Sequence, residues 1–322
     1  MGGPTILDVA KRAYVSRSTA SLALSDRADR VSPDTRERVL AAARELGYRV
    51  NPMASQLRSG AGGDVAFIYH PLDEFEMEHG SGPMWARFAM TLGMELGRDD
   101  YRLLMLEKSE AQGQRLNVSA ALAFSESADD LDVPEFPFGV PVWVASTSSI
   151  APHTRISYDF SRIASEVYEY LAQTHDRAES EELSVAVCVR GVQDPPFTES
   201  MMAALERAGA ELGVDLTISR VDPRADEELK AFMSCAQEQS TEVIMSWGVP
   251  IPRQFIDLSE PDAPTVFAFC ENELPAEFPA STPYLSFCLD DAARAVGSEV
   301  CAALGGREPR EIVLAHELRL PQ

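Results

Sequence analysis

The chain has 322 residues, of which 45% are hydrophobic and 25% are charged, so it can form two or three globular domains with real cores. It has no run of 18 apolar residues, and its first residues lack the pattern of a secretory signal. These absences argue against a transmembrane helix and lead us to expect a cytoplasmic protein. The net charge of −23 argues at first against a nucleic-acid partner.

The charge is unevenly distributed along the chain. Residues 1–60 carry ten Lys and Arg against six Asp and Glu, a net charge of +4, whereas the remainder carries 18 against 45, a net charge of −27. A basic N-terminal segment on an acidic body suggests that the segment binds a polyanion while the body is held away from it.

Three short helices are predicted within residues 5–47. Thr5 can cap the first helix, and Asp8, three residues later, can complete a capping box. The helical pattern then breaks, and Ser16 is the N-cap candidate for a second helix that runs to about Leu24.

The third helix has clear signals at both ends. Ser32 is its predicted N-cap, Pro33 lies in its first turn, and Gly47 ends it. Residues 51–63 then predict a helix of about seven residues followed by a glycine-rich linker. A helix this short is not stable alone in water, so its ordering requires contacts from outside.

From residue 64 onwards, short apolar runs alternate with amphipathic stretches, the pattern of parallel sheets with helices on both faces. The predicted strands lie in 64–70, 101–107, 118–124, 140–146, 183–189, 216–221, 242–247 and 264–269. The predicted helices lie in 85–98, 162–174, 198–212, 227–238 and 292–304. Because this region is large for one sheet and 146–159 could be a crossover, we expect two α/β lobes with a cleft between them.

The segment TILDVAKRAYVSRSTASLALSDRADRVSPDTRERVLAAARELGYRVNPMASQLRSG closely resembles the headpiece of the LacI/GalR family of bacterial transcription regulators. Nearly every fixed position of the family pattern is present, which is far more specific than a generic helix-turn-helix match. The remaining residues resemble the family's periplasmic-binding-protein-like body more loosely. The resemblance implies an all-α helix-turn-helix headpiece (1–50), a hinge helix and linker (51–63), and an α/β body of two parallel-sheet lobes (64–322).

The resemblance also implies how the headpiece contacts DNA. A helix-turn-helix lays its second helix in the major groove, where family members contact bases from the positions of Arg17, Ser18 and Leu22. Arg17 can donate to guanine O6 and N7, whereas Leu22 can only pack on a thymine methyl group. The side chains expected at phosphates are Thr5, Ser16, Thr19, Ser21, Tyr48 and Asn51.

The stretch NPMASQL resembles the family's hinge helix. Two such helices, one per subunit, would pair in the minor groove, with Leu57 wedged into the central base step and Ala54 where the two helices approach. Two-fold symmetry then predicts a homodimer on a palindromic operator.

Tyr14 departs from the family at the bend between the first two helices. Relatives place glycine or asparagine there, where positive φ is easy, so a tyrosine costs roughly 1 kcal/mol if the bend keeps that geometry. Ring packing or a phosphate contact would offset this cost, and we expect Tyr14→Gly to fold.

The body departs from the family at the residues that would hold a sugar effector. Phe197 and Trp247 stand at positions where relatives carry polar anchors, although Asp159 matches a family aspartate. A pocket lined by Trp85, Phe197 and Trp247 would prefer an aromatic or apolar effector, so an ordinary sugar is not expected. The alternative is that the body binds no effector and serves only for dimerisation.

Catalytic and metal-binding patterns are absent from the sequence. We find no G-x-S-x-G, P-loop, G-x-G-x-x-G or H-E-x-x-H, so we expect neither an enzyme nor a cofactor. The five cysteines form no C-x-x-C pair, and the acidic stretch 70–79 has no metal-ligand spacing, so we expect buried thiols and a solvated loop. The hypothesis is a DNA-binding repressor, and the alternative is a small-molecule sensor with weak or lost DNA affinity.

Overall fold

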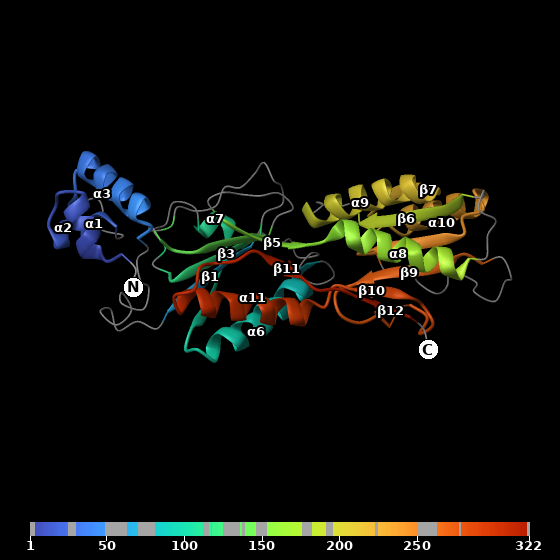
Figure 1. Cartoon of the computed structure of the whole chain (residues 1–322). Helices are drawn as coiled ribbons and strands as arrows, with labels where there is room; N and C mark the ends of the chain where they lie inside the picture. Colours follow the sequence, from blue (N-terminus) through green and yellow to red (C-terminus); the bar gives the residue numbers. More distant parts are fainter. Residues whose placement is uncertain are drawn as a thin grey trace.

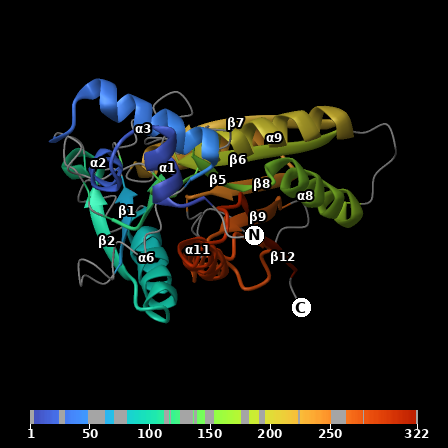
Figure 2. The ribbon, with the colours of Figure 1, turned by 60° about the vertical axis from the view of Figure 1, so that its left-hand side comes forward.

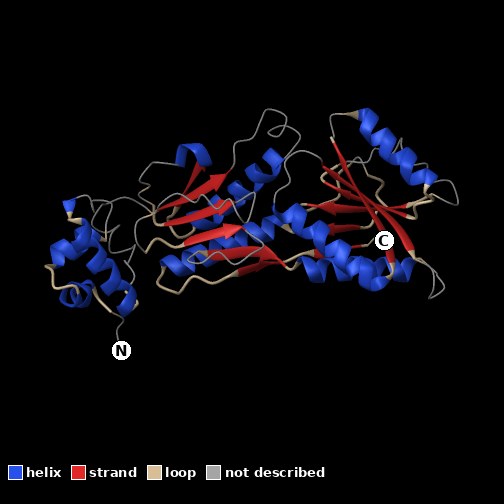
Figure 3. Ribbon diagram, turned by 90° about the horizontal axis from the view of Figure 1, so that it is seen from above, coloured by secondary structure: helices blue, strands red, loops and turns tan. Residues whose placement is uncertain are grey.

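The computed structural model describes residues 4–24, 30–48, 63–69, 81–111, 116, 118–124, 136, 139–145, 153–175, 182–190, 196–222, 225–249, 263–276 and 278–320. Within these ranges the chain forms a helical headpiece followed by two α/β lobes (Figure 1). The headpiece lies at the end of the first lobe that is away from the second (Figures 1 and 3). The predictions on 51–62 and on 70–80 fall outside the described residues. No described helix is long and apolar enough to cross a bilayer.

The headpiece contains the three predicted helices, α1 (Ile6–Arg12), α2 (Arg17–Ala23) and α3 (Pro33–Leu46). The predicted caps are confirmed: the Thr19 N–H donates to Ser16 Oγ at 3.0 Å, and Gly47 ends α3 with φ of 63°. The three helices bury a small core of Val9, Ala10, Ala13, Ala20, Ala23, Leu24, Val39, Ala42 and Ala43. Small side chains at helical spacing let three short helices pack closely, so this core stabilises helices that would not persist alone.

The first lobe is a parallel sheet in the order β11-β5-β4-β3-β1-β2. Its strands are β1 (Asp64–Tyr69), β2 (Arg102–Glu107), β3 (Ala120–Phe124), β4 (Val142–Ala145), β5 (Thr154–Tyr158) and β11 (Ile312–Leu314). Helices α6 (Ser81–Gly97) and α11 (Leu289–Leu304) pack side by side on one face (Figures 1 and 2). The short α7 (Lys108–Ala111) lies on the other. The fully buried Trp143 anchors this core, and its indole N–H donates to the Arg310 carbonyl at 3.2 Å.

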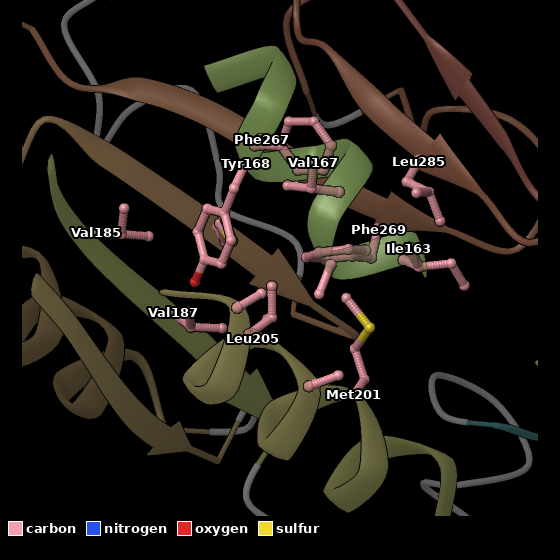
Figure 4. Close-up of a cluster of buried hydrophobic side chains, with 14 of the residues drawn as sticks. Ile163, Val167, Tyr168, Val185, Val187, Met201, Leu205, Phe267, Phe269 and Leu285 are labelled. Carbon is pink, nitrogen blue, oxygen red and sulfur yellow. The ribbon is translucent and has the colours of Figure 1, made fainter. Parts of the chain in front are cut away.

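The second lobe has a sheet in the order β12-β10-β9-β8-β6-β7. Its strands are β6 (Leu183–Arg190), β7 (Val214–Val221), β8 (Val243–Trp247), β9 (Thr265–Cys270), β10 (Tyr284–Ser286) and β12 (Glu317–Arg319). Helices α8 (Phe160–Thr174) and α9 (Pro196–Leu212) cover one face, and α10 (Asp226–Glu238) covers the other. Figure 4 shows the core beneath α8 and α9, where Ile163, Met201, Leu205 and Phe267 meet.

The chain crosses between the lobes three times: from β5 into α8, from β10 into α11, and from β11 into β12. The first two crossovers are joined, because the Tyr158 hydroxyl donates to the Phe287 carbonyl at 2.8 Å. At the third, His316 Nε2 lies 2.7 Å from Glu166 Oε2 on α8. Polar contacts therefore join the first crossover to the second and the third crossover to α8.

The two-lobed parallel architecture predicted from the sequence is confirmed, although β5, α7, β10, β11 and β12 are not among the predicted elements. Part of the stretch 146–159, predicted as a crossover, forms β5, and the crossover follows it at Tyr158. β5 escapes prediction because only two of its five side chains are buried, so it lacks a clear apolar run. The second sheet is also not wholly parallel, because the chain enters β12 from the opposite end and pairs antiparallel with β10.

Candidate nucleic-acid interface

The first turn of α2 presents a connected group of hydroxyls. Ser16 Oγ lies 2.8 Å from both Ser18 Oγ and Thr19 Oγ1, in addition to accepting the Thr19 N–H. This network holds three oxygen atoms at the start of the helix in one arrangement. Such short, fixed hydroxyls suit phosphate contacts, and a base contact from Ser18 competes with its bond to Ser16.

Arg17, the first residue of α2, has an exposed side chain with no hydrogen-bond or ion-pair partner among the described residues. Arg12 differs, because its guanidinium donates to Glu45 Oε1 at 2.9 and 3.1 Å and so ties α1 to α3. All the donors of Arg17 therefore remain available to a ligand, as bidentate contact with guanine requires.

The remaining residues of α2 divide between core and surface. Ala20, Ala23 and Leu24 are buried against α1 and α3, which orients the helix. Ser21 and Leu22 are half-buried, so each keeps only part of its surface for an external contact. Of the predicted contacts, Ser16, Arg17, Ser18, Thr19, Ser21 and Leu22 thus lie on or beside one short helix whose other side is fixed in the core.

Thr5 and Tyr48 lie at the ends of helices, as predicted for phosphate-contacting residues. The Thr5 N–H and hydroxyl both donate to Asp8 Oδ2, at 2.8 and 2.7 Å, and these bonds hold the pKa of Asp8 below its ordinary value of 3.8. A phosphate would have to compete with Asp8 for the single hydroxyl proton of Thr5. The Tyr48 ring packs against the headpiece core. The other predicted contacts, Asn51, Ala54 and Leu57, lie outside the described residues.

Two of the predicted effector residues, Phe197 and Trp247, lie in the second lobe and belong to one aromatic cluster that also includes Tyr158 at the end of β5. The Phe197 ring lies 5.9 Å from the Tyr158 ring, and the Trp247 ring lies 5.2 Å from that of Phe287. The rings of Tyr158 and Phe287 themselves lie 5.0 Å apart. Phe197 and Trp247 are therefore joined through the two residues that connect the lobe crossovers.

The hydrogen-bond donors of this aromatic cluster are already used within the protein. The Trp247 indole N–H donates to Thr198 Oγ1 at 2.9 Å, and the Tyr158 hydroxyl donates to the Phe287 carbonyl. Sequence analysis missed Tyr158, Thr198 and Phe287. No local signal could have identified the Tyr158–Phe287 bond, because its two residues are 129 positions apart.

The side chains of Trp85 and Asp159 make their contacts with residues outside that cluster. Trp85 packs edge-on against Phe67 and Phe88 in the first lobe, with ring centroids 6.0 and 6.3 Å away. The Asp159 carboxylate accepts the Arg162 N–H at 3.1 Å and caps α8. The structure thus gives Asp159 a capping role, and it groups Trp85 with different aromatic rings from Phe197 and Trp247.

Comparisons with known proteins relate the chain to bacterial transcription regulators. A family model described as bacterial regulatory proteins, lacI family, matches residues 5–51. The maltose regulon regulatory protein MalI of Vibrio furnissii is 33% identical over 108 residues, which cover 34% of this chain and 72% of that protein. MalI of Escherichia coli is 36% identical over 125 residues, which cover 39% of this chain and 34% of that protein, so the match spans about a third of that relative's length.

Solved structures extend the likeness over the whole chain. A complex of the transcriptional regulator CelR with cellobiose has a TM-score of 0.57 at 18% identity and covers 98% of both chains. The lac repressor dimer bound to operator and the anti-inducer ONPF has a TM-score of 0.56 at 14% identity and covers 99% of both chains. At these identities the likeness establishes the fold of both lobes. From the family model and the Vibrio furnissii relative together, the chain belongs to the LacI family of bacterial regulatory proteins.

Proposed function

We propose that the chain is a sequence-specific DNA-binding transcription regulator, acting as a repressor, and not an enzyme. The observation that carries this proposal is α2, which lies inside the segment matched by the family model. Ser16 caps this helix, and its first residue, Arg17, is exposed and has no hydrogen-bond partner among the described residues. In the proposed complex Arg17 and Ser18 contact base edges, and Leu22 packs on a thymine methyl group. A DNA target places the protein in the bacterial cytoplasm.

The affinity comes from phosphate contacts and from the hinge. Residues proposed at phosphates are Thr5, Ser16, Thr19, Ser21, Tyr48 and Asn51. In the hinge and linker, 51–63, Ala54 permits close approach of two helices, and Leu57 enters the minor groove. The charge distribution supports this arrangement, because the net charge of −27 beyond residue 60 disfavours DNA contacts by the body.

We propose that the protein binds a palindromic operator as a homodimer through an apolar face of the first lobe. This face consists of Met90 and Met94 on α6 and Met105 on β2, which are exposed by 65, 70 and 43%. α6 packs against β2, the end strand of its sheet, and Met105 lies on the same side of β2 as Leu103, which packs in the core beneath α6. Exposed apolar side chains gathered on one face mark an interaction surface. The lac repressor, which shares this fold, was solved as a dimer on its operator.

The proposed DNA binding is tested by selecting duplexes from a random library with the purified full-length protein. We expect enrichment of one palindrome and an affinity that falls steeply as salt is added, because phosphate contacts release counterions. Enrichment of no palindromic sequence would overturn the proposal. It would favour the alternative, a small-molecule sensor without useful DNA affinity.

The proposed dimer is tested by sedimentation of a Met90→Glu, Met94→Glu double variant. Two carboxylates buried against their symmetry mates would be strongly unfavourable, so we expect monomers that retain the helical content of the parent. The matched control is Leu212→Glu, since Leu212 is also exposed, by 54%, but lies at the end of α9 in the other lobe. An unchanged dimer in the double variant would place the interface elsewhere.

We also propose that the effector of the body is an apolar or aromatic molecule rather than an ordinary sugar. Sugar recognition needs free hydrogen-bonding groups. The hydrogen-bond donors of Trp247 and Tyr158 are used within the protein, so these residues offer a ligand only their aromatic rings. The test adds indole or cellobiose to the protein–operator complex. Release by indole alone, abolished by Trp247→Ala and retained by Trp85→Ala, supports the proposal. Release by cellobiose alone contradicts it, and no response to either probe favours a body that only dimerises.

A further inference from the structure

The bend between α1 and α2 holds a tyrosine in a backbone conformation that tyrosine rarely adopts. Tyr14 has φ of 55°, in the left-handed region where a Cβ atom crowds the backbone. Its N–H donates to the Lys11 carbonyl at 3.2 Å, and the next N–H, of Val15, donates to the Ala10 carbonyl at 3.0 Å. Ala13, on the other side, is buried. The bend is therefore fixed on both sides, and Tyr14 cannot relax without breaking these contacts.

The Tyr14 side chain makes no stabilising contact in the described part of the chain that would offset the energetic cost of this backbone conformation. It is 89% exposed and has neither a hydrogen bond nor a ring contact with any described residue. Tyr48, the other headpiece tyrosine, instead packs its ring against the core. A strained residue without internal compensation points to a contact outside the protein.

The surroundings of Tyr14 indicate the chemistry of that contact. Lys11 lies three residues before it and Arg17 three residues after it, and both side chains are exposed. Arg17 forms no ion pair in the described ranges, and Lys11 interacts with the Asp8 carboxylate, whose pKa its charge helps to lower. Two exposed cations near a phenol in the sequence favour a polyanion as partner, and the phenol O–H can donate to a phosphate oxygen.

Building on the DNA-binding function proposed above, we propose that Tyr14 is a DNA-contacting residue whose hydroxyl donates to a backbone phosphate beside the groove that α2 enters. Tyr14 lies two residues before Ser16, the cap of α2, so this bond would fix the position of the helix relative to the duplex. Contacts to phosphate carry no base information, so the effect of Tyr14 is the same on every sequence.

Two variants test the contact on the full-length protein, using the selected palindromic duplex and a random-sequence duplex of the same length. Tyr14→Phe removes only the hydroxyl, and we expect roughly tenfold weaker binding to both duplexes. The slope of log affinity against log salt should stay unchanged, because the phenol is neutral. Tyr14→Gly should weaken binding as much while raising the thermal stability of the headpiece, since glycine accepts this φ without strain.

Two further variants serve as controls. Tyr284→Phe removes the same atom from β10 in the second lobe and should leave both affinities unchanged. Lys11→Gln should weaken binding and also make the slope of log affinity against log salt shallower by about one ion per protomer. This change in slope distinguishes the loss of a charge at Lys11 from the loss of a neutral donor at Tyr14.

Parent-like affinity of both Tyr14 variants for both duplexes would overturn the inference. So would parent-like affinity combined with lost repression in cells, which would identify a protein as the partner of Tyr14. Failure of the proposed function is distinguishable from either result. In that case selection with the parent protein would enrich no palindromic duplex before any variant is measured.

Discussion

The headpiece and the crossover region between the lobes use their polar groups in opposite ways. In the headpiece, Arg17 keeps all its donors unpaired among the described residues, and Ser16 and Ser18 at the start of α2 are exposed. In the crossover region, the donors of Tyr158 and Trp247 end on protein acceptors inside an aromatic cluster. The first arrangement is complete only with an external partner, whereas the second is complete within the chain.

This contrast explains why sequence similarity is strong in one region and weak in the other. A base edge is recognised by a particular side chain with particular donors, so the headpiece must keep those residues. A packed core requires apolar side chains of suitable volume and tolerates many combinations of them. Accordingly, the family model matches residues 5–51, while whole-chain structural likeness persists at 14–18% identity.

The largest expected effect is the loss of operator affinity on substitution of Arg17, the residue that distinguishes the headpiece in this comparison. Arg17→Ala should weaken operator binding by about 1–3 kcal/mol and relax the preference at one operator position, because a bidentate base contact is lost. The measurement is affinity for four duplexes that differ only at that position. Arg294→Ala on α11, which removes the same charge from the body, should leave all four affinities unchanged. An equal loss on all four duplexes from Arg17→Ala would assign Arg17 to phosphate instead.

The sequence predicted those parts of the molecule whose cause is local. Ser16 caps the start of α2 and Gly47 ends α3. Each cap depends on contacts with residues no more than four positions away, and both predictions are confirmed. The bend at Tyr14 keeps the positive φ on which the expected cost of a tyrosine depends. Buried strands such as β6 and β8 were predictable because their apolar runs are continuous.

The parts that escaped prediction depend on residues far apart in the chain. The contact between Tyr158 and Phe287 arises only because two lobe crossovers meet in space. Nothing in the residues around Trp85 indicates that its ring packs with Phe67 and Phe88 rather than with Phe197 or Trp247. Periodicity identifies which side chains are buried, but only the tertiary arrangement decides which of them meet.

A smaller effect is expected from a matched pair of substitutions within the body. Tyr158→Phe removes the donor to the Phe287 carbonyl and should lower the free energy of unfolding by about 1–2 kcal/mol, since a partly buried acceptor is left unsatisfied. Tyr168→Phe should change it by less than about 0.5 kcal/mol or increase it. The Tyr168 hydroxyl is buried and has no hydrogen-bond partner among the described residues. It points from α8 toward α9 (Figure 4), where a Cβ on Gly209 would lie 3.3 Å from it.

Urea denaturation followed by circular dichroism measures both tyrosine variants under one protocol. Equal m-values would show that the same surface unfolds in each protein, so that the midpoints can be compared. Equal destabilisation by the two substitutions would contradict the assignment, because it would mean that the Tyr168 hydroxyl also has a partner.

The smallest expected effect concerns the cap of α1 and depends on pH. The folded-state pKa of Asp8 lies below its ordinary value of 3.8 because its carboxylate accepts two hydrogen bonds from Thr5. The contribution of this cap to stability is therefore fully present above that value and is lost as pH falls through the lowered pKa. Asp8→Asn removes the charge, so its hydrogen exchange in α1 should be faster than the parent's at neutral pH. At equal temperature this difference should narrow toward pH 3. Asp34→Asn in the first turn of α3 is the control, because there the Ser32 hydroxyl accepts the Thr35 N–H and supplies the cap. A difference for Asp8→Asn that stays constant with pH would show that the cap does not depend on the charge of Asp8. Local capping would then stabilise α1 in the same way as the uncharged cap of α2, where Ser16 accepts from Thr19.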